Sequence, residues 1–183
     1  MKYLKKITLK DGSECVIRNA NEKDGKAAFE IFNKTHEETD FLLSYPEENS
    51  FNVEEEGEFL QKKTDSENEI ELIAEVDGKG VALAGIESLG SKYKIRHRAE
   101  FGISVLKDYE GLGIGRAMTE ACIECAKNAG YVQLELDVVA DNARALSLYK
   151  SVGFTEYGRN PLGFNSRESG FQELLLMRLE LKG

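Results

Sequence analysis

Hydrophobic and polar positions alternate with a period of two in residues 7–18, ITLKDGSECVIR, on both sides of an Asp-Gly pair. Residues 69–90 contain two mostly apolar runs, one on either side of Asp77 and Gly78. A period of two is typical of strands with one buried face, and Asp-Gly favours a tight turn. Each stretch is therefore expected to form two strands joined by a turn.

Between these strand pairs, the hydrophobic spacing becomes helical. A first helix is expected from about residues 21–24 to His36. A second is expected after Asn52, which can cap it and has Glu55 three residues later, a variant of the capping box. The stretch between them, residues 39–50, has no period and is rich in aromatic and acidic residues, so an irregular segment is expected.

In the second half, a strand, a glycine-rich loop, a helix and another strand follow one another. In the expected strand 98–106, Phe101 lies on one face and Glu100 on the other. The helical period runs to Ala129, and residues 131–139 alternate again. Two strands joined by one helix favour a right-handed crossover and a parallel pair. A short helix over 142–151 and strands near 154–157 and 171–181 complete a mixed α/β sheet, expected to be one domain over residues 1–183.

The amino-acid composition limits the classes of molecule that this protein is expected to bind. The chain has 33 Asp and Glu against 24 Lys and Arg, a formal net charge of −9, without a dense basic cluster. Nucleic acid is therefore not expected as a partner, whereas a cationic partner is allowed. No stretch approaches the roughly 20 apolar residues of a membrane helix, and the basic start lacks the apolar run of a signal peptide. A cytoplasmic protein without a membrane partner is expected.

Three cysteines, an odd number, suit a reducing compartment better than a disulfide framework. Cys122 and Cys125 form a C-x-x-C, a spacing also found in redox and metal sites. Both fall on the apolar face of the expected helix, and the chain has no second pair of such ligands. We expect two buried packing cysteines and no metal.

Three glycines, Gly111, Gly113 and Gly115, lie between the expected strand and its helix. Without Cβ atoms, the backbone N–H groups of such a loop can approach an anion, and the helix N-terminus adds partial positive charge. A dinucleotide-binding G-x-G-x-x-G would need a small residue where Arg116 or Met118 stands, and a P-loop would need G-K-S/T. The loop is a candidate diphosphate site, and a turn that only packs is the alternative.

Together with two other stretches, this loop resembles the GNAT superfamily of N-acetyltransferases. The acetyl-CoA loop of that family reads Q/R-x-x-G-x-G/A, and residues 110–115, EGLGIG, match both glycine positions but have Glu110 at the first. Residues 142–154 resemble N-x-x-A-x-x-L-Y-x-x-x-G-F, and residues 99–105 resemble the strand before the loop. The resemblance covers residues 70–181. It implies a mostly antiparallel central sheet with a parallel pair at its centre and flanking helices.

The resemblance also implies cofactor contacts. Backbone groups at the end of the strand would bind the pantetheine arm, and amides of the loop would hold the pyrophosphate. Asn142 and Ala145 would contact the cofactor arm, and the Tyr149 hydroxyl would lie near the sulfur. The implied cofactor-binding residues are thus Ile103, Ser104, Val105, Gly111, Leu112, Gly113, Ile114, Gly115, Arg116, Asn142, Ala145 and Tyr149.

Direct acetyl transfer to an amine needs a base for the ammonium and an acid for the leaving thiolate. Tyr149, with an ordinary pKa of about 10, is protonated at neutral pH and suits the second task. A core tyrosine is the alternative. Glu100 lies beside the implied cofactor arm and is the candidate base. Glu87, His97 and Asp137 are rivals.

The sequence thus suggests an acetyl-CoA-dependent N-acetyltransferase that transfers acetyl directly to a primary amine of a small cationic molecule or a protein, without a metal. Residues 39–49, with Glu47 and Glu48, lie where the family usually builds its acceptor wall, and acidic groups there would favour a cationic amine. A mobile acidic surface loop is the alternative for this segment. A catalytically silent acyl-CoA-binding or sensing domain is the alternative function. A homodimer, common in the family, is possible.

Overall fold

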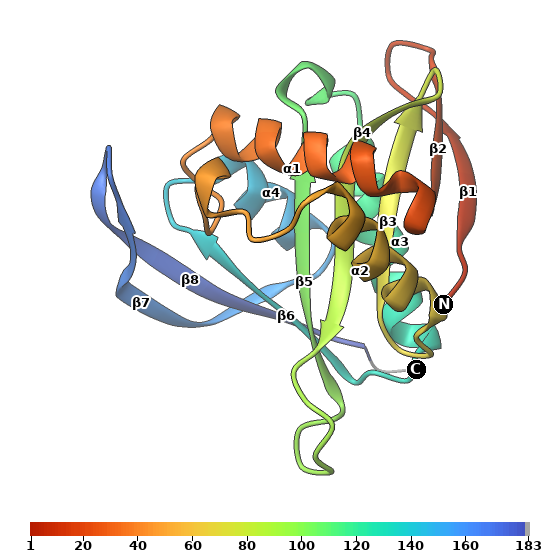
Figure 1. Ribbon diagram of the computed structural model, residues 1–183. Coiled ribbons are helices and arrows are strands. Elements are labelled where there is room, and N and C mark those ends of the chain that lie inside the picture. Colours follow the sequence, from red (N-terminus) through yellow and green to blue (C-terminus); the bar gives the residue numbers. More distant parts are fainter. Residues whose placement is uncertain (182–183) are drawn as a thin grey trace.

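The computed structural model describes residues 1–181, in which eight strands form a single sheet (Figure 1). Its order is β1-β2-β3-β4-β5-β6-β8-β7, and every neighbouring pair is antiparallel except β5 and β6. The expected parallel pair at the centre of a mostly antiparallel sheet is therefore confirmed. The strands are β1 Leu4–Thr8, β2 Glu14–Asn19, β3 Ile70–Val76, β4 Lys79–Ser88, β5 Arg98–Val105, β6 Gln133–Val139, β7 Thr155–Ser166 and β8 Gly170–Glu180.

Four α-helices cover the two faces of this sheet (Figure 1). The helices are α1 Gly25–Glu38, α2 Val53–Asp65, α3 Ile114–Asn128 and α4 Ala143–Ser151. Short 3₁₀ segments occur at Glu22–Asp24, Pro46–Glu48 and Lys107–Tyr109. None of the helices in residues 1–181 is long and apolar enough to cross a membrane.

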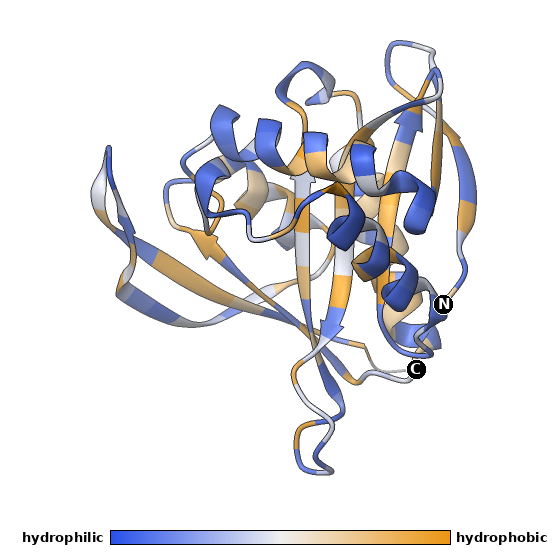
Figure 2. Ribbon diagram, in the orientation of Figure 1, coloured by the Kyte–Doolittle hydropathy of each residue, from blue (hydrophilic) through white to orange (hydrophobic). Residues whose placement is uncertain are grey.

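Separate hydrophobic clusters hold the helices to the two faces. On one face, Ile31 of α1 and Leu60 of α2 pack against Ile73 and Leu83 of the sheet, and we call this the α1–α2 face. On the other face, a larger cluster joins α3 and α4 to the central strands, and we call this the α3–α4 face. Figure 2 shows hydrophobic residues concentrated along the central strands and hydrophilic ones on the outer turns of α1 and α2.

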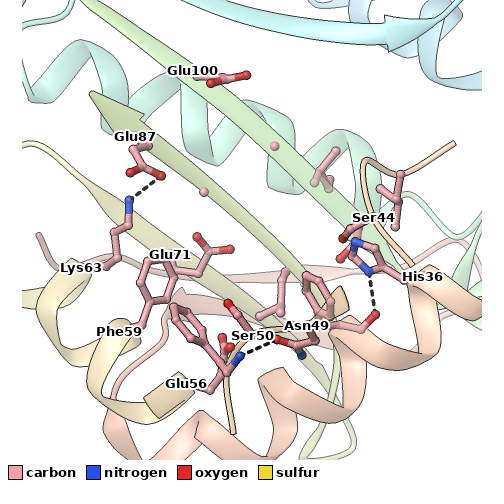
Figure 3. Close-up of a pocket in the computed structure, with 18 of the residues that line it drawn as sticks. His36, Ser44, Asn49, Ser50, Glu56, Phe59, Lys63, Glu71, Glu87 and Glu100 are labelled. Carbon is pink, nitrogen blue, oxygen red and sulfur yellow. Dashed lines mark hydrogen bonds and ion pairs between the residues drawn. The ribbon is translucent and has the colours of Figure 1, made fainter. Parts of the chain in front are cut away.

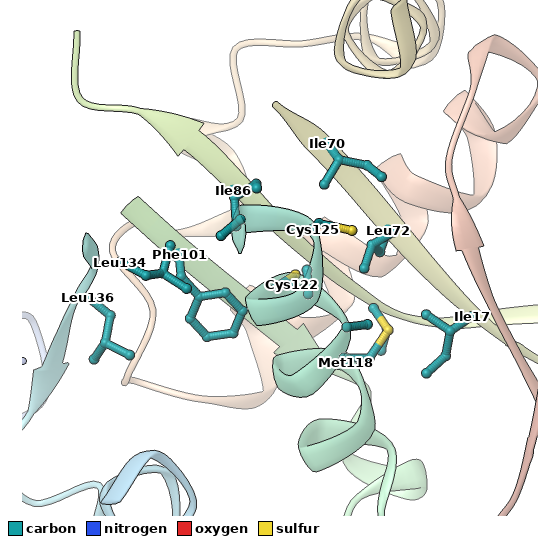
Figure 4. Close-up of a cluster of buried hydrophobic side chains, with 14 of the residues drawn as sticks. Ile17, Ile70, Leu72, Ile86, Phe101, Met118, Cys122, Cys125, Leu134 and Leu136 are labelled. Carbon is teal, nitrogen blue, oxygen red and sulfur yellow. The ribbon is translucent and has the colours of Figure 1, made fainter. Parts of the chain in front are cut away.

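The cysteines of the C-x-x-C belong to the larger cluster. Cys122 and Cys125 of α3 pack among apolar side chains such as Leu72 and Phe101 (Figure 4). Their side chains are almost completely buried, and burial raises the pKa of the Cys125 thiol to about 11. Thiols that stay protonated are poor nucleophiles and poor metal ligands. The structure places both cysteines where the packing interpretation expects them.

Most of the expected elements are present, and the second helix begins as predicted. The Asn52 side chain accepts hydrogen bonds from the Glu54 and Glu55 amides, and the Glu55 carboxylate accepts one from the Asn52 amide at 2.9 Å. The expected capping box is therefore confirmed. β7 is the main difference, because it extends far beyond the strand expected near residues 154–157. Two register shifts in its pairing with β8 interrupt the alternation, and Pro161 is tolerated because β7 is an edge strand.

The parallel pair at the centre of the sheet is short. Only residues 98–100 of β5 pair with β6, opposite residues 133–135, although β5 runs to Val105 and β6 to Val139. On their other sides, the two strands pair over seven positions with β4 and β8. The two strands therefore separate beyond Glu100, and the facing backbone edges of β5 and β6 have no strand between them. We call this opening the β5–β6 gap.

Candidate active site

The glycine loop leads from the end of β5 to the N-terminus of α3. Gly111 and Gly113 have φ values of 79° and 104°, in the left-handed region that favours glycine, and Gly113 is the N-cap residue of α3. A Cβ added at Gly113 would meet no atom within 4 Å. The protein therefore leaves open space at Gly113, and the backbone conformation requires glycine there.

The amides of this loop are available to an anion. Within residues 1–181, the six N–H groups from Gly111 to Arg116 donate no hydrogen bond to a protein acceptor. The first N–H groups of a helix lack intrahelical partners, and the helix dipole adds positive charge at this end. Open space beside six free donors is the arrangement of an anion-binding loop.

Glu110, an acidic residue next to the glycine loop, has its charge compensated by a neighbouring side chain. Glu110, where the family pattern has Gln or Arg, forms an ion pair with Arg144 of α4. The Arg116 guanidinium donates to the Ser151 hydroxyl at 2.7 Å and lies 3.6 Å from the Glu120 carboxylate. Arg116 therefore offers the loop its backbone amide, while its side chain ties α3 to α4. Because Arg144 compensates its charge, Glu110 is compatible with an anion nearby.

Asn142 and Ala145 form the N-terminal cap of α4. The Asn142 side-chain oxygen accepts a hydrogen bond from the Ala145 amide at 3.1 Å. This bond occupies the Ala145 N–H and leaves the side-chain NH₂ of Asn142 as a donor. The contact of both residues with a cofactor stays a prediction.

Tyr149 of α4 lies on the α3–α4 face, behind the β5–β6 gap. Its ring packs edge-on against Phe101 of β5, with ring centroids 6.1 Å apart, and against Phe154 at 5.9 Å. The residue is only 8% exposed, and burial raises the pKa of its hydroxyl to about 12. Tyr149 is thus a protonated phenol throughout the neutral range.

Glu100 lies on the opposite face of β5. Since successive side chains of a strand alternate, Glu100 points to the α1–α2 face while Phe101 and its neighbour Tyr149 occupy the α3–α4 face. Partial burial, and then the charges of Asp137, Glu87 and Glu135, raise the pKa of Glu100 above its usual range. A carboxylate with a raised pKa is a stronger base.

The rival bases differ in their surroundings. Glu87 lies opposite Glu100 on β4 and forms an ion pair with Lys63 at 3.3 Å. Asp137 of β6 also has a raised pKa, caused by burial and by Glu135. His97 is exposed in the turn before β5. Within residues 1–181, Glu100 and Asp137 thus have no ion pair, whereas Glu87 and Glu135 do, and Glu100 is the one of the two unpaired carboxylates that lines the cavity described next.

A cavity of about 570 Å³ opens in front of Glu100, between the sheet, α1, α2 and the segment that joins them (Figure 3). Ile103 and Ser104 also line it, so the cavity reaches the stretch of β5 expected to bind the cofactor arm. Glu48 lines the cavity as well, and its carboxylate accepts a hydrogen bond from the Tyr45 amide at 2.8 Å. Glu47 forms an ion pair with Arg167 at the tip of the β7–β8 hairpin.

Sequence reasoning missed four ionisable residues of this cavity: His36, Glu56, Lys63 and Glu71. His36 stacks on Phe32 with centroids 3.8 Å apart, and burial lowers the pKa of its imidazole. Glu71 gave only a weak signal, because it shares a face of β3 with the apolar Ile73 but also with Glu75. Glu56 and Lys63 gave no comparable signal, since charged residues are common on helices.

Known proteins share this architecture. At 30% identity, an acetyltransferase of the GNAT family from Streptococcus pneumoniae superposes with a TM-score of 0.86, over 91% of this chain and 99% of its own. The Salmonella typhimurium protein yncA, solved with its cofactor acetyl-CoA, superposes with a TM-score of 0.80 at 22% identity, over 92% and 94% of the two chains.

Two curated relatives from Escherichia coli differ in how much they match. The L-amino acid N-acetyltransferase AaaT is 28% identical over 78% of this chain and 83% of its own length. The ribosomal protein bS18-alanine N-acetyltransferase is 45% identical, but only over 31% of this chain and 38% of its own length. The sequence profile of the acetyltransferase (GNAT) family matches residues 26–154, well over half of the sequence, and the chain therefore belongs to that family.

Proposed function

We propose that this protein is an acetyl-CoA-dependent N-acetyltransferase that transfers the acetyl group directly to a primary amine. The observation that carries the proposal is the division of groups around the β5–β6 gap. A candidate base, Glu100, lies on one face of the sheet, and a candidate acid, Tyr149, lies behind the other. Free loop amides lie at the end of the same strand. A reaction that joins an amine to a thioester needs these three elements.

The backbone would bind the cofactor. The amides from Gly111 to Arg116 would hold the pyrophosphate, and the free edge of β5 at residues 103–105 would bind the pantetheine arm as an added strand would. The Asn142 side-chain NH₂ is left free to contact that arm. When bound, acetyl-CoA would supply an acetyl group activated as a thioester.

The two side chains would manage the protons. Glu100, directly or through a water molecule, would take a proton from the substrate ammonium, so that the neutral amine can attack the thioester carbon. A C–N bond forms and the C–S bond breaks, while the Tyr149 hydroxyl gives its proton to the departing sulfur. The nitrogen then loses its second proton, which restores the phenol. The products are an N-acetylated amine, a free thiol and one proton, held by Glu100 and then released to solvent.

The acceptor would be a small cationic amine. The cavity beside Glu100 lies within the range of about 300–1,000 Å³ typical of small-molecule sites. Its carboxylates favour a positive charge. The two E. coli relatives carry names that specify L-amino acids and a protein alanine, so acceptors differ among the proteins that resemble this chain.

Release of free thiol from acetyl-CoA tests the proposal. Thiol should appear in proportion to enzyme when alkyl amines are added, and mass spectrometry should find one acetyl group on the amine nitrogen. Acetyl-CoA binding without thiol release, over a panel of small amines, amino acids and peptides, would contradict the proposal and favour a silent acyl-CoA-binding domain.

A further inference from the structure

We propose that the end of the cavity remote from the β5–β6 gap is a binding site for a second cationic group of the acceptor, formed by Glu71 of β3 and Glu56 of α2. The acceptor class is then an aliphatic amine with two positive charges. The inference rests on the proposed function, because it assumes that the reacting amine lies at Glu100.

The sheet register places Glu71 on the floor of the cavity. Glu71 lies opposite Gly85 of β4, and Gly85 lies opposite Gly102 of β5. A Cβ on Gly85 would lie 2.0 Å from the Glu71 carboxylate, so the missing side chain makes room for that carboxylate. A Cβ on Gly102 would meet no atom within 4 Å. Two adjacent glycines thus leave a stretch of sheet without side chains between Glu71 and Glu100.

Glu56 is the second, independent observation. It is 7% exposed and lines the cavity (Figure 3), yet its carboxylate has no hydrogen bond or ion pair within residues 1–181. Its carboxylate oxygens open onto the cavity, so that solvent or a ligand, and not a protein group, is their partner. Its pKa is raised by burial. A cationic ligand would supply the missing partner.

Among the described residues that line the cavity, the one lysine is already engaged in ion pairs. Lys63 forms ion pairs with Glu69 and Glu87, each at 3.3 Å, and the second is visible in Figure 3. Glu56 and Glu71 therefore face the cavity without a cation of their own among the described residues. The walls beside them include Phe51 and Phe59, whose ring centroids are 5.6 Å apart. Aromatic faces attract cations and also accommodate a methylene chain.

The spacing of the carboxylates limits the size of the acceptor. Glu71 and Glu100 are separated by two strand spacings and by two residues along the strand, so their Cα atoms lie about 12 Å apart. One short aliphatic chain can place an amine at each carboxylate, because both side chains extend from the same face. An amino acid would bring its carboxylate into this acidic cavity and would be disfavoured.

The protonation state of Glu71 gives cation binding a measurable signature. Burial, together with Glu56 and Glu87, raises the pKa of Glu71 to about 8, although Lys63 opposes the shift. At pH 7, Glu71 in the empty cavity is therefore largely protonated. A cation bound beside it favours the carboxylate, so binding should release a proton.

A matched pair of acceptors tests the site. Cadaverine and pentylamine have the same carbon chain, but pentylamine lacks the second ammonium. We expect kcat/KM to favour cadaverine about 10- to 100-fold, as for a hydrogen bond to a charged group, and norleucine to be the poorest acceptor. Glu71→Gln should bring the ratio close to one, and Glu58→Gln, on the exposed face of α2, should leave it unchanged. Glu56→Gln is the second variant if Glu71→Gln folds poorly.

Calorimetry on the CoA-loaded protein separates this inference from the proposed function. In two buffers of different ionisation enthalpy, cadaverine should bind with proton release, and Glu71→Gln should weaken binding and reduce the number of protons released. If neither amine is acetylated but cadaverine binds in this way, the cation site stands and the transferase proposal fails. If both amines are acetylated equally well, or Glu71→Gln keeps the cadaverine preference, the cation site is overturned and the transferase proposal stands.

Discussion

The glycine loop and the cavity lie on either side of the β5–β6 gap, and they offer different atoms to their ligands. The loop offers backbone amides from six consecutive residues, held by one helix terminus and two left-handed glycines. The cavity offers side chains from α1, α2, β3, β4 and β5, which are far apart in the sequence. A site built from backbone amides would tolerate change at its side chains, such as Glu110 where the family pattern has Gln or Arg, whereas a site built from side chains would change its ligand with each substitution. This difference would let a family keep one donor and exchange acceptors.

The strongest test of the loop is Gly113→Val. The side chain would enter the open space in front of the amides, and valine strongly disfavours a φ of 104°. We expect acetyl-CoA binding to become undetectable by calorimetry. Gly130→Val is the matched control, because Gly130 lies just beyond the other end of α3 with a φ of 81° and equally open space. If Gly113→Val binds like the Gly130 variant, the loop does not hold the pyrophosphate.

The next largest effect is expected for Tyr149→Phe, which keeps the ring and removes the acidic hydrogen. General acid catalysis contributes about 10²–10⁴-fold, so kcat should fall by that factor while acetyl-CoA affinity stays nearly the same. The loss should shrink with a thioester whose leaving thiol is more acidic. Tyr131→Phe is the control, since Tyr131 is another buried tyrosine and its hydroxyl accepts a bond from Asn68. Unchanged kcat in Tyr149→Phe would remove Tyr149 from the mechanism.

On the cavity side, Glu71→Gln should change stability in a pH-dependent way. The folded pKa of Glu71 is about 8 and its ordinary value is 4.5, so the carboxyl favours the folded state below about pH 4.5 and loses that contribution as pH rises to 8. A shift of that size corresponds to at most about 5 kcal/mol. Because the Glu71 side chain is only partly buried, we expect the free energy of unfolding of Glu71→Gln to exceed that of the wild type by about 1–3 kcal/mol at pH 9. Near pH 4.5 the two proteins should differ little. Denaturant unfolding at both pH values measures the difference in free energy of unfolding between the two proteins. A difference that does not depend on pH would contradict the raised pKa.

The smallest effect is expected for Glu110→Gln. Its charge is already compensated by Arg144, and the loop amides would carry the binding. Acetyl-CoA affinity should stay the same or rise slightly, because Arg144 would then be free to approach the anion. A clear loss of affinity in a titration would show that Glu110 supports the loop in a way that the ion pair does not explain.

Sequence alone predicted the strand before the glycine loop and the helix after it. Left-handed glycines, a helix N-terminus and a strand before them are local features, so Gly111 and Gly113 could be placed from their neighbours. The parallel pair followed from the order strand, helix, strand, and the opposite faces of Glu100 and Phe101 followed from periodicity. The length of β7 did not, because register shifts in the strand interrupt its alternation.

The cavity could not be predicted in the same way. Glu56 and Glu71 line the same cavity only because α2 packs across the sheet, and no local sequence pattern predicts that they lie close together. Glu47 illustrates the reverse case. The sequence placed it in the acceptor wall, whereas in the fold its carboxylate is engaged by Arg167, 120 residues away. Side-chain partners across such distances depend on the tertiary structure.

The central claim is that acetyl transfer uses a base and an acid on opposite faces of the sheet, at the β5–β6 gap. The most direct test is the pH dependence of kcat/KM in Glu100→Gln. In the wild type, kcat/KM with an alkyl amine should rise with pH through a Glu100 pKa above its usual range. The variant should follow the free amine, whose pKa is about 10 as for lysine. The ratio of wild type to variant should therefore be about 10²–10⁴ near pH 7 and shrink toward about pH 10, with acetyl-CoA affinity unchanged. A ratio that stays constant from about pH 6 to about pH 10, or that stays near one, would contradict the account.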